Sequence, residues 1–253
     1  MSVHELRVGP RGQSGSRRRG RGRTWLLRRA AAGIVAVTLV VGLFIAVAWP
    51  LTPSVGDAEQ RIRRALGQHG AQDLGVLPSP DRVGVAIIAT EDSRFRHHWG
   101  VDVLGVLRAA LSFSHNRDQG GATLDQQLAK NVWTGSGGLW GKVEQVEIAF
   151  KLERRYSKDE ILEMYLSDAY FGHGFYGLPA AARGFFGGSP AELSWAQASL
   201  LAGLVQAPSA YDPYVHLARA RQRQRHVLDR LVATGVLTAT QANSAYAAPL
   251  GLR

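Results

Sequence analysis

Residues 30–49 form an unbroken apolar stretch, AAAGIVAVTLVVGLFIAVAW, which contains no charged residue. As an α-helix rising about 1.5 Å per residue, a stretch of this length spans about 30 Å, the hydrocarbon thickness of a bilayer. Trp25 and Trp49 lie near its two ends, where interfacial aromatic residues are favoured. The stretch therefore predicts a transmembrane helix near the N-terminus, so the rest of the chain is expected to fold beside a membrane.

The charge of the preceding segment gives this predicted helix an orientation. Residues 1–29 carry nine arginines and a single acid, Glu5. Because positive charge is retained in the cytoplasm, we expect residues 1–29 to be a cytoplasmic tail and the chain after about residue 50 to lie outside the cytoplasm. Two alternatives are a cleaved signal peptide, whose apolar core is usually about 7–15 residues long, and an arginine-rich arm that binds nucleic acid. We favour the retained anchor in the bacterial cytoplasmic membrane and expect no nucleic-acid partner.

The rest of the sequence predicts a mainly α-helical fold. No segment shows the sustained alternation that is typical of a β-strand. We expect residues 50–80 to be a linker with one helix near 57–68, and residues 81–253 to form one domain that includes the C-terminal helices. Capping boxes, in which a hydroxyl residue precedes Gln or Glu by three positions, begin at Thr123, Ser157, Ser194 and Thr238. Further helices are predicted at 142–155, 158–168, 195–204, 214–233 and 238–247.

Two segments have the residue types that catalysis requires. The apolar run at 83–89 leads to Glu91 and Asp92. A carboxylate at the end of such a helix can be half desolvated, which raises its pKa and makes it a better base. At 119–131 a glycine-rich turn leads into a helix N-terminus and Lys130, a combination that suits an anion such as phosphate. The alternatives are helix-end acids in solvent and an ordinary turn before an amphipathic helix.

Two later segments are ambiguous when each is taken alone. Glu147 and Lys151 stand four residues apart in the predicted helix 142–155, which is typical of a routine surface ion pair. The segment 157–186 is rich in aromatic residues, which could form a platform for a sugar, although core packing is their commoner role. These aromatic residues are Tyr170, Phe171, Phe175 and Tyr176.

Taken in order, the four segments resemble the glycosyltransferase domain of peptidoglycan polymerases, glycosyltransferase family 51, and look most like its monofunctional, membrane-anchored members. The resemblance covers about residues 80–215. It implies a lysozyme-like helical domain with a small membrane-facing jaw, to which residues 101–121 would belong. The matching runs are EDSRFRHHWG at 91–100, GGATLDQQLAKN at 120–131, Lys142 in the third segment and the residues from Lys158 to Gly177 in the fourth.

The resemblance also implies a reaction. Glu91 would be the general base that deprotonates the 4-hydroxyl of lipid II, which then attacks the growing glycan strand and displaces undecaprenyl pyrophosphate. Lys130 and Lys142 would stabilise the departing diphosphate, with Mg²⁺ or Mn²⁺ as an ion carried by that diphosphate. Other cell-wall synthesis proteins are candidate partners. The residues expected to bind substrate are Asp92, Phe95, His98, Thr123, Gln126, Gln127, Lys130, Asn131, Lys142, Glu144 and Gln145.

Departures from the family pattern leave two rival functions open. Ala122, Gly141, Gln145 and Ser167 replace the usual Ser, Arg, Glu and Asn. The chain therefore offers fewer cations to the phosphate than the family pattern does, and an amide replaces the second carboxylate. The rivals are a non-catalytic protein that binds lipid II as a scaffold, and a membrane-tethered muramidase, which would not need cations for a diphosphate. The chain has no cysteine, which excludes thiolate metal sites, and its His, Asp and Glu spacings predict no protein-held metal.

Overall fold

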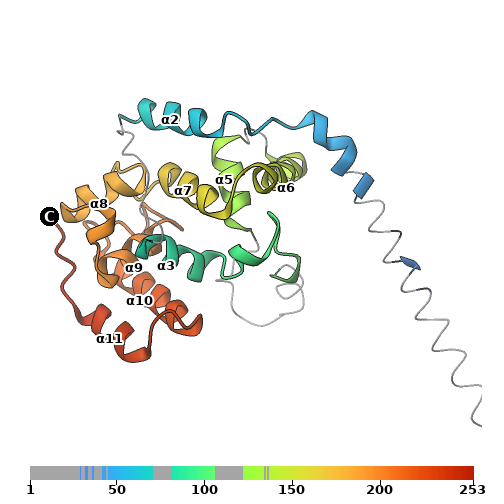
Figure 1. Cartoon of the computed structure of the whole chain (residues 1–253). Helices are drawn as coiled ribbons and strands as arrows, with labels where there is room; N and C mark the ends of the chain where they lie inside the picture. Colours follow the sequence, from blue (N-terminus) through green and yellow to red (C-terminus); the bar gives the residue numbers. More distant parts are fainter. Residues whose placement is uncertain are drawn as a thin grey trace, which may run out of the picture. The chain divides into compact units, whose positions relative to one another are not determined.

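The computed structural model describes residues 29, 32–33, 36, 42–43, 45–70, 81–105, 122–133, 135 and 137–253 (Figure 1). They belong to two units, Met1–Leu51 and Thr52–Arg253, and the first contains the short 3₁₀ helix η1 (Trp49–Leu51). Among the described residues, no helix combines the length and the apolar character needed to cross a bilayer. The predicted cytoplasmic tail and most of the predicted transmembrane helix fall outside the described residues. So do residues 71–80 of the linker, most of the predicted jaw and the glycine turn at 120–121.

The second unit is mainly α-helical, as predicted. The β-structure of its described residues is limited to two isolated bridges, Trp99–Val101 and Tyr170–Tyr176. The predicted lysozyme-like arrangement and membrane-facing jaw stay predictions. The α-helices are α2 (Ala58–Gln68), α3 (Arg82–Glu91), α5 (Leu124–Val132), α6 (Gly138–Arg155), α7 (Lys158–Asp168), α8 (Leu178–Phe186), α9 (Trp195–Leu204), α10 (Leu217–Ala233) and α11 (Ala239–Ala247). Two 3₁₀ helices, η2 (Phe95–His97) and η3 (Pro190–Glu192), lie between them.

All four predicted capping boxes form. Thr123, Ser157, Ser194 and Thr238 each accept a hydrogen bond from the third backbone N–H of the helix that follows. The structure differs from the prediction at two helix starts. α6 begins at Gly138, before the predicted residue 142. α10 begins after the predicted residue 214, because the Asp212 carboxylate accepts the backbone N–H of Tyr214 at 2.9 Å and stabilises a turn there.

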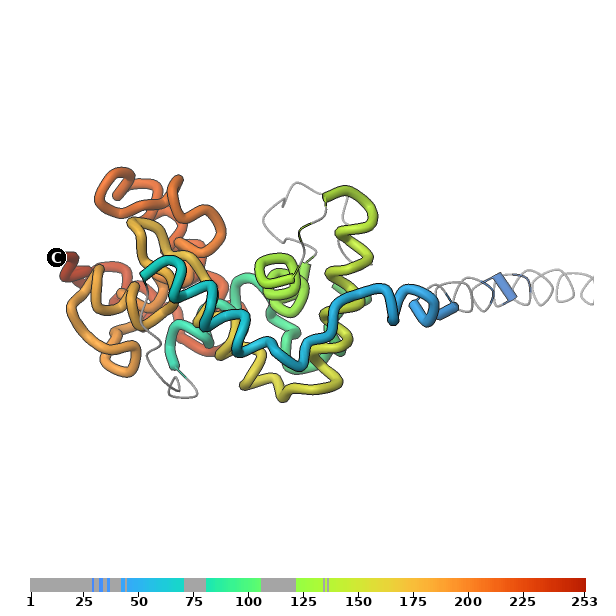
Figure 2. The backbone as a smooth tube through the Cα atoms, turned by 90° about the horizontal axis from the view of Figure 1, so that it is seen from above, coloured from blue at the N-terminus to red at the C-terminus, as the bar shows by residue number. Residues whose placement is uncertain are grey.

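The helices of this unit form two groups that share one hydrophobic core. α9 packs against α3 and α10, and α11 packs against α10. α5 packs against α6 and α7, while α2 lies across α7 and α5. Figure 2 shows the orange and red C-terminal helices together at one end of this unit and the yellow-green α5 and α6 towards the other. The loop that follows α3 joins the two groups, and it carries the EDSRFRHHWG run.

The segment Thr52–Val55 is bound tightly to the helical domain, although it lies in the predicted linker. The Lys151 ammonium donates to the Thr52 carbonyl at 2.8 Å, the Thr52 hydroxyl at 2.7 Å and the Pro53 carbonyl at 3.1 Å. The Tyr156 hydroxyl donates to the Val55 carbonyl at 2.9 Å. Because this segment and α2 pack onto α5 and α7, the compact unit begins at Thr52 rather than at residue 81.

Candidate active site

Glu91 is the last residue of α3, and it lies at the edge of the core. The helix begins where Asp81 accepts the backbone N–H of Gly84 at 2.6 Å, and it buries most of its apolar side chains. The Glu91 side chain keeps 16% of its surface exposed. Its Oε1 accepts a hydrogen bond of 2.7 Å from Nη2 of Arg223, a buried residue of α10. The carboxylate is therefore partly desolvated and paired with a fixed cation.

Opposing effects act on the protonation of Glu91. Burial raises its pKa, and the neighbouring Asp92 charge adds to the rise, whereas the charge and the hydrogen bond of Arg223 lower it. The C-terminal end of α3 also carries the negative end of the helix dipole. There the Arg230 guanidinium donates to the Ala89 carbonyl at 3.2 Å. Two arginines of α10 thus offset the negative charge at this helix end, so a base of raised proton affinity can stay ionised.

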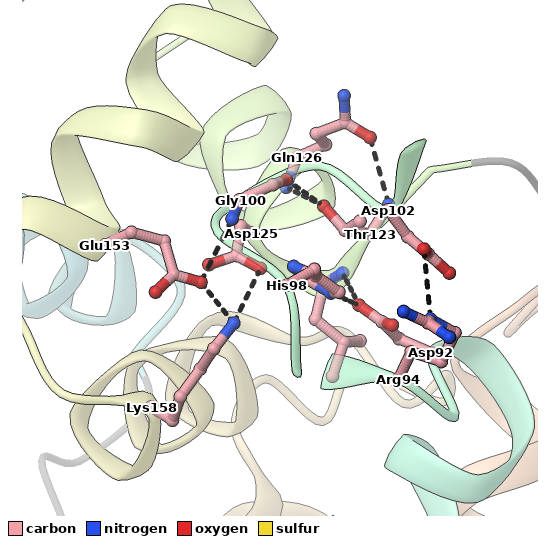
Figure 3. Close-up of polar contacts among 11 residues, drawn as sticks. Asp92, Arg94, His98, Gly100, Asp102, Thr123, Asp125, Gln126, Glu153 and Lys158 are labelled. Carbon is pink, nitrogen blue, oxygen red and sulfur yellow. Dashed lines mark hydrogen bonds and ion pairs between the residues drawn. The ribbon is translucent and has the colours of Figure 1, made fainter. Parts of the chain in front are cut away.

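Asp92 points away from Glu91 into the protein. His98 Nε2 donates to Asp92 Oδ2 at 2.9 Å, and the same oxygen accepts the backbone N–H of Leu124 at 3.1 Å (Figure 3). Leu124 is the first residue of α5. Asp92 therefore joins the loop after α3 to the N-terminal end of α5, which is a positioning role.

Further along the same loop, Gly100 fixes the chain against α6. Its φ is +73°, and a Cβ at this position would lie 2.8 Å from the Ala149 carbonyl carbon, so only glycine fits. The Gly100 N–H donates to Glu153 at 3.1 Å, and its carbonyl accepts the Thr123 hydroxyl at 2.6 Å (Figure 3). The loop is therefore bound to α5 through Asp92 at one end, and to α6 and the N-cap of α5 through Gly100 at the other end.

Four of the residues that were predicted to bind substrate are shielded from solvent. Their side chains are buried, with exposed fractions of 6% for Asp92, 0% for Phe95, 7% for His98 and 3% for Thr123. Asp92, His98 and Thr123 are hydrogen-bonded within the protein, and Phe95 lies beneath the Lys158 ammonium at 4.2 Å. Their hydrogen bonds hold the loop after α3 against the start of α5.

Tyr165 of α7 connects Glu91 with the exposed part of α5. Its hydroxyl donates to Gln127 Oε1 at 3.1 Å. Burial raises the Tyr165 pKa, and the Glu91 charge raises it further. Gln127 is partly exposed, whereas Gln126 is committed to the capping box, where its Oε1 accepts the Thr123 N–H at 3.0 Å.

A cavity of about 320 Å³ opens at the C-terminal end of α5. Asn131 hydrogen-bonds the Asp168 carboxylate, whose pKa is raised by burial and lowered by that bond and by the His69 charge. Aromatic rings form another wall, where Tyr176 stacks on His69 at 3.8 Å and lies 4.5 Å from Tyr170. Rings beside hydrogen-bonding side chains suit a sugar. The cavity is lined by Ala65, Leu66, His69, Asn131, Asp168, Tyr170 and Tyr176.

The predicted cations Lys130 and Lys142 both have exposed side chains. Lys130 lies on the last turn of α5, beside Asn131. Lys142 lies on the first turns of α6, where its ammonium donates to Gln145 Oε1 at 3.3 Å. Glu144 accepts the Trp140 indole N–H at 3.0 Å. The start of α6 thus presents an exposed lysine beside an amide and a carboxylate.

The predicted surface pair of Glu147 and Lys151 was wrong. Glu147 is 1% exposed and Lys151 is 8% exposed, because this face of α6 packs against the segment after residue 51. Burial raises the Glu147 pKa and lowers the Lys151 pKa, and the attraction between the two residues opposes both shifts. Helical spacing alone could not reveal the segment that covers them.

Asp92, His98 and Asp125 offer metal-ligand atoms that lie within 4.8 Å of one another. Asp92 and His98 are, however, bonded to each other, and the Lys158 ammonium lies 3.9 Å from Asp125. A lysine charge at that distance opposes a metal cation. Hydrogen bonds and proton sharing therefore explain the group better than metal coordination.

Comparison with known proteins assigns the domain. A family model described as transglycosylase matches residues 62–232. The chain belongs to the transglycosylase family. This transglycosylase match includes Glu91, α5, the start of α6 and Arg223.

Three curated relatives are penicillin-binding proteins. The Aquifex aeolicus penicillin-binding protein 1A is 39% identical over 81% of this chain and 28% of its own length. The Neisseria gonorrhoeae penicillin-binding protein 1A is 38% identical over 78% of this chain and 25% of its own length. The Bacillus subtilis penicillin-binding protein 1F is 39% identical over 74% of this chain and 27% of its own length. A crystal structure of the Haemophilus influenzae protein 1A aligns at a TM-score of 0.37 with 34% identity, over 38% of this chain and 14% of that one. This chain spans about a quarter of the length of the curated relatives.

Sequence reasoning missed Arg223 in this transglycosylase domain. The residue lies in the arginine-rich run ARARQRQRH, which reads as a solvated helix face. A signal was present, because Arg223 is followed at four and five residues by Val227 and Leu228, which mark the buried face of α10. An arginine on that face needs a partner inside the protein.

Proposed function

We propose that this chain is a peptidoglycan glycosyltransferase that polymerises lipid II into β-1,4-linked glycan strands. The observation that carries the proposal is the setting of Glu91, a partly desolvated carboxyl group that is hydrogen-bonded to Arg223 at the edge of the core. The family match and the relatives described as penicillin-binding proteins support the same activity. A base of this kind can take a proton that solvent would remove slowly, with a rate gain of roughly 10²–10⁴-fold.

In the proposed reaction, Glu91 accepts the proton of the 4-hydroxyl of lipid II while that oxygen bonds to the anomeric carbon of the growing strand. The bond from this carbon to the diphosphate breaks, and undecaprenyl pyrophosphate leaves with both electrons. Lys130 and Lys142 are the cations we assign to the diphosphate, because both are exposed. A Mg²⁺ or Mn²⁺ ion carried by the diphosphate would add to this charge. The cavity beside Asn131 would accept a sugar of one substrate.

The membrane anchor is part of the same proposal. We infer that residues 30–49 span the bacterial cytoplasmic membrane and that the glycosyltransferase domain lies outside the cytoplasm, as in a monofunctional polymerase. The uncharged apolar stretch and the nine preceding arginines support this orientation. Protease added to intact spheroplasts should digest the domain and spare an N-terminal tag. Protection of the domain would contradict the orientation.

A non-catalytic protein that binds lipid II is the second candidate. It is favoured by Gln145, which stands where the family pattern has a glutamate and accepts the Lys142 ammonium at 3.3 Å. An amide cannot act as the second carboxylate of that pattern. If Glu144 does not replace it, the site would bind substrate without turning it over.

One assay separates these functions. Purified protein is incubated with labelled lipid II or with finished glycan, and the products are resolved on gels. We expect polymer from the wild type, about 10²–10⁴-fold less from Glu91→Gln, and wild-type output from the control Glu59→Gln, whose side chain on α2 is 66% exposed. Binding without polymer would favour the scaffold, and cleavage of finished glycan would favour the muramidase. Equal output from wild type and Glu91→Gln would remove Glu91 from its role.

A further inference from the structure

Asp125 is a completely buried acid beneath the loop that carries the site. Its exposed fraction is 0%, and both carboxyl oxygens lack a hydrogen-bond donor among the described residues. It projects from the first turn of α5 towards Glu153 of α6 and Lys158 of α7 (Figure 3). Fully buried acids are rare unless they are paired. Nothing in the proposed catalytic step uses Asp125, so its burial needs its own physical explanation.

The charges around Asp125 do not balance if every acid is ionised. One ammonium, that of Lys158, serves two carboxyl groups. It forms a close ion pair with Glu153 and lies 3.9 Å from Asp125 Oδ2. The Asp125 and Glu153 carboxyl groups both face the Lys158 ammonium and so lie next to each other (Figure 3). Two carboxylates have no proton to share, so this contact is favourable only when one of them is protonated.

We propose that Asp125 is a positioning residue that works as a neutral acid, and that its carboxyl proton forms a hydrogen bond to Glu153. This inference rests on the proposed function only where it concerns catalysis. With the proton on Asp125, Glu153 remains the sole anion facing Lys158. Glu153 can then accept from three donors, which are the Asp125 hydroxyl, the Lys158 ammonium and the Gly100 N–H.

These bonds hold the loop that follows Glu91. Gly100 is fixed by Glu153 and by Thr123, and Phe95 is covered by the Lys158 ammonium at 4.2 Å. If Asp125 ionises, it repels Glu153 and competes for Lys158, so both supports of the loop weaken. Glu91 lies directly before this loop, and a displacement of about 1 Å at a reacting group can reduce a rate about 10²-fold.

Titratable groups from three parts of the chain face Asp125. Asp92 and His98 from the loop after α3 lie within 4.8 Å of it by their ligand atoms. Glu153 approaches from α6 and Lys158 from α7. Burial raises the pKa of Asp125 to about 8, the Glu153 charge raises it and the Lys158 charge lowers it. Asp125 is thus protonated in the folded protein near neutral pH.

The protonation of Asp125 predicts in which direction the stability of the protein changes with pH. In the unfolded chain the Asp125 pKa is near its ordinary value of 3.8, whereas in the folded protein it is about 8. The stabilising contribution is complete below about pH 4 and is lost as pH rises towards about 8. Between these values the folding equilibrium constant of the wild type should fall, relative to a variant that cannot ionise, by up to about tenfold per pH unit.

Urea unfolding from pH 5 to pH 9 tests the inference with Asp125→Asn, because an amide donates to Glu153 without ionising. We expect the ratio of wild-type to variant folding constants to fall from pH 5 to 8 and then level off. Asp159→Asn, a matched change at a side chain that is 55% exposed, should follow the wild type. Asp125→Leu, which offers no donor, should be less stable than Asp125→Asn. Parallel wild-type and Asp125→Asn curves, or equal stability of the Leu and Asn variants, would overturn the inference.

The rate of glycan synthesis adds a readout that a purely structural acid would not change. At saturating lipid II, the wild-type rate should decline above about pH 8, where Asp125 ionises, while Asp125→Asn keeps its rate. The same decline in both proteins would overturn the positioning role. A further outcome is that Mn²⁺ stabilises the wild type, that EDTA reverses this, and that Asp125→Asn does not respond. This result would show that Asp125 binds a cation rather than a proton, and it would also overturn the inference. The unfolding result does not need activity, so it stands or falls separately from the proposed glycosyltransferase.

Discussion

Glu91 and Asp125 are acids on two sides of one loop, and they differ in exposure and in the cation beside them. Glu91 keeps 16% of its side chain exposed and has Arg223 to itself at 2.7 Å. Asp125 is fully buried and shares Lys158 with Glu153. Burial raises the pKa of both acids, but a dedicated cation opposes the rise at Glu91. Burial alone therefore does not decide what a buried acid does in this domain. An acid paired with its own cation can serve as a base, whereas an acid that shares its cation with a second acid serves as a proton donor.

Removal of Lys158 should have the largest effect on this comparison. Lys158→Met leaves Glu153 buried without its cation, and the loss of one partner of a buried pair costs about 3–5 kcal/mol of unfolding free energy. Urea unfolding at pH 7 measures the change, with Lys158→Arg as the variant that keeps the charge. A loss below about 1 kcal/mol would mean that the Asp125 centre does not depend on its shared cation.

Removal of Arg223 should have an intermediate effect that depends on pH. In Arg223→Met, burial and Asp92 still raise the Glu91 pKa while the opposing cation is gone, so less of the base is ionised in acid. The loss of a charge-assisted hydrogen bond, about 1.5–3 kcal/mol, corresponds to a rate about 10- to 100-fold lower at pH 6 and recovers as pH rises. The pH–rate profile of lipid II polymerisation measures it. Arg223→Lys should restore part of the acid limb, and a loss that is uniform with pH would contradict this role.

The smallest effect is expected for a third pair, which joins the same loop and helix at the surface. Arg96 donates to Asp159 at 2.7 Å, with 44% and 55% of the two side chains exposed. Solvent-exposed pairs contribute about 0–1 kcal/mol. Arg96→Ala should therefore change the unfolding free energy by less than about 1 kcal/mol and leave the pH dependence intact. A loss as large as that of Lys158→Met would show that burial does not separate these pairs.

Local signals in the sequence predicted much of this fold. Thr123 and Ser157 mark helix starts because the bonds they accept lie within one turn, so four residues of sequence contain the whole interaction. The sequence also singled out the acid pair as a candidate site, because an apolar run leads into Glu91 and Asp92. The two acids then part, because Asp92 is buried and bound to His98 and Leu124, which the sequence did not reveal.

The rest depends on contacts between distant segments, which a local pattern cannot contain. Asp125 looks like an ordinary acid in the first turn of a helix, where the dipole favours it, until Glu153 and Lys158 are placed around it. Glu147 and Lys151 have the spacing of a surface pair, and only the position of Thr52 and Pro53 buries them. In each case the sequence fixes the helix face, while the neighbour that covers the face comes from the tertiary fold.

The pairing of Glu91 with Arg223 also governs when the domain can begin to work. The two residues are separated by 132 positions, so the contact is non-local and closes late. While the chain is being synthesised, α3 can be complete long before α10 emerges from the ribosome. A nascent domain would then hold Glu91 without its arginine and without the α10 surface that packs against α3. Competence is therefore coupled to completion of the C-terminal helices, and fragments that end before α10 should be inert even where their N-terminal helices are formed.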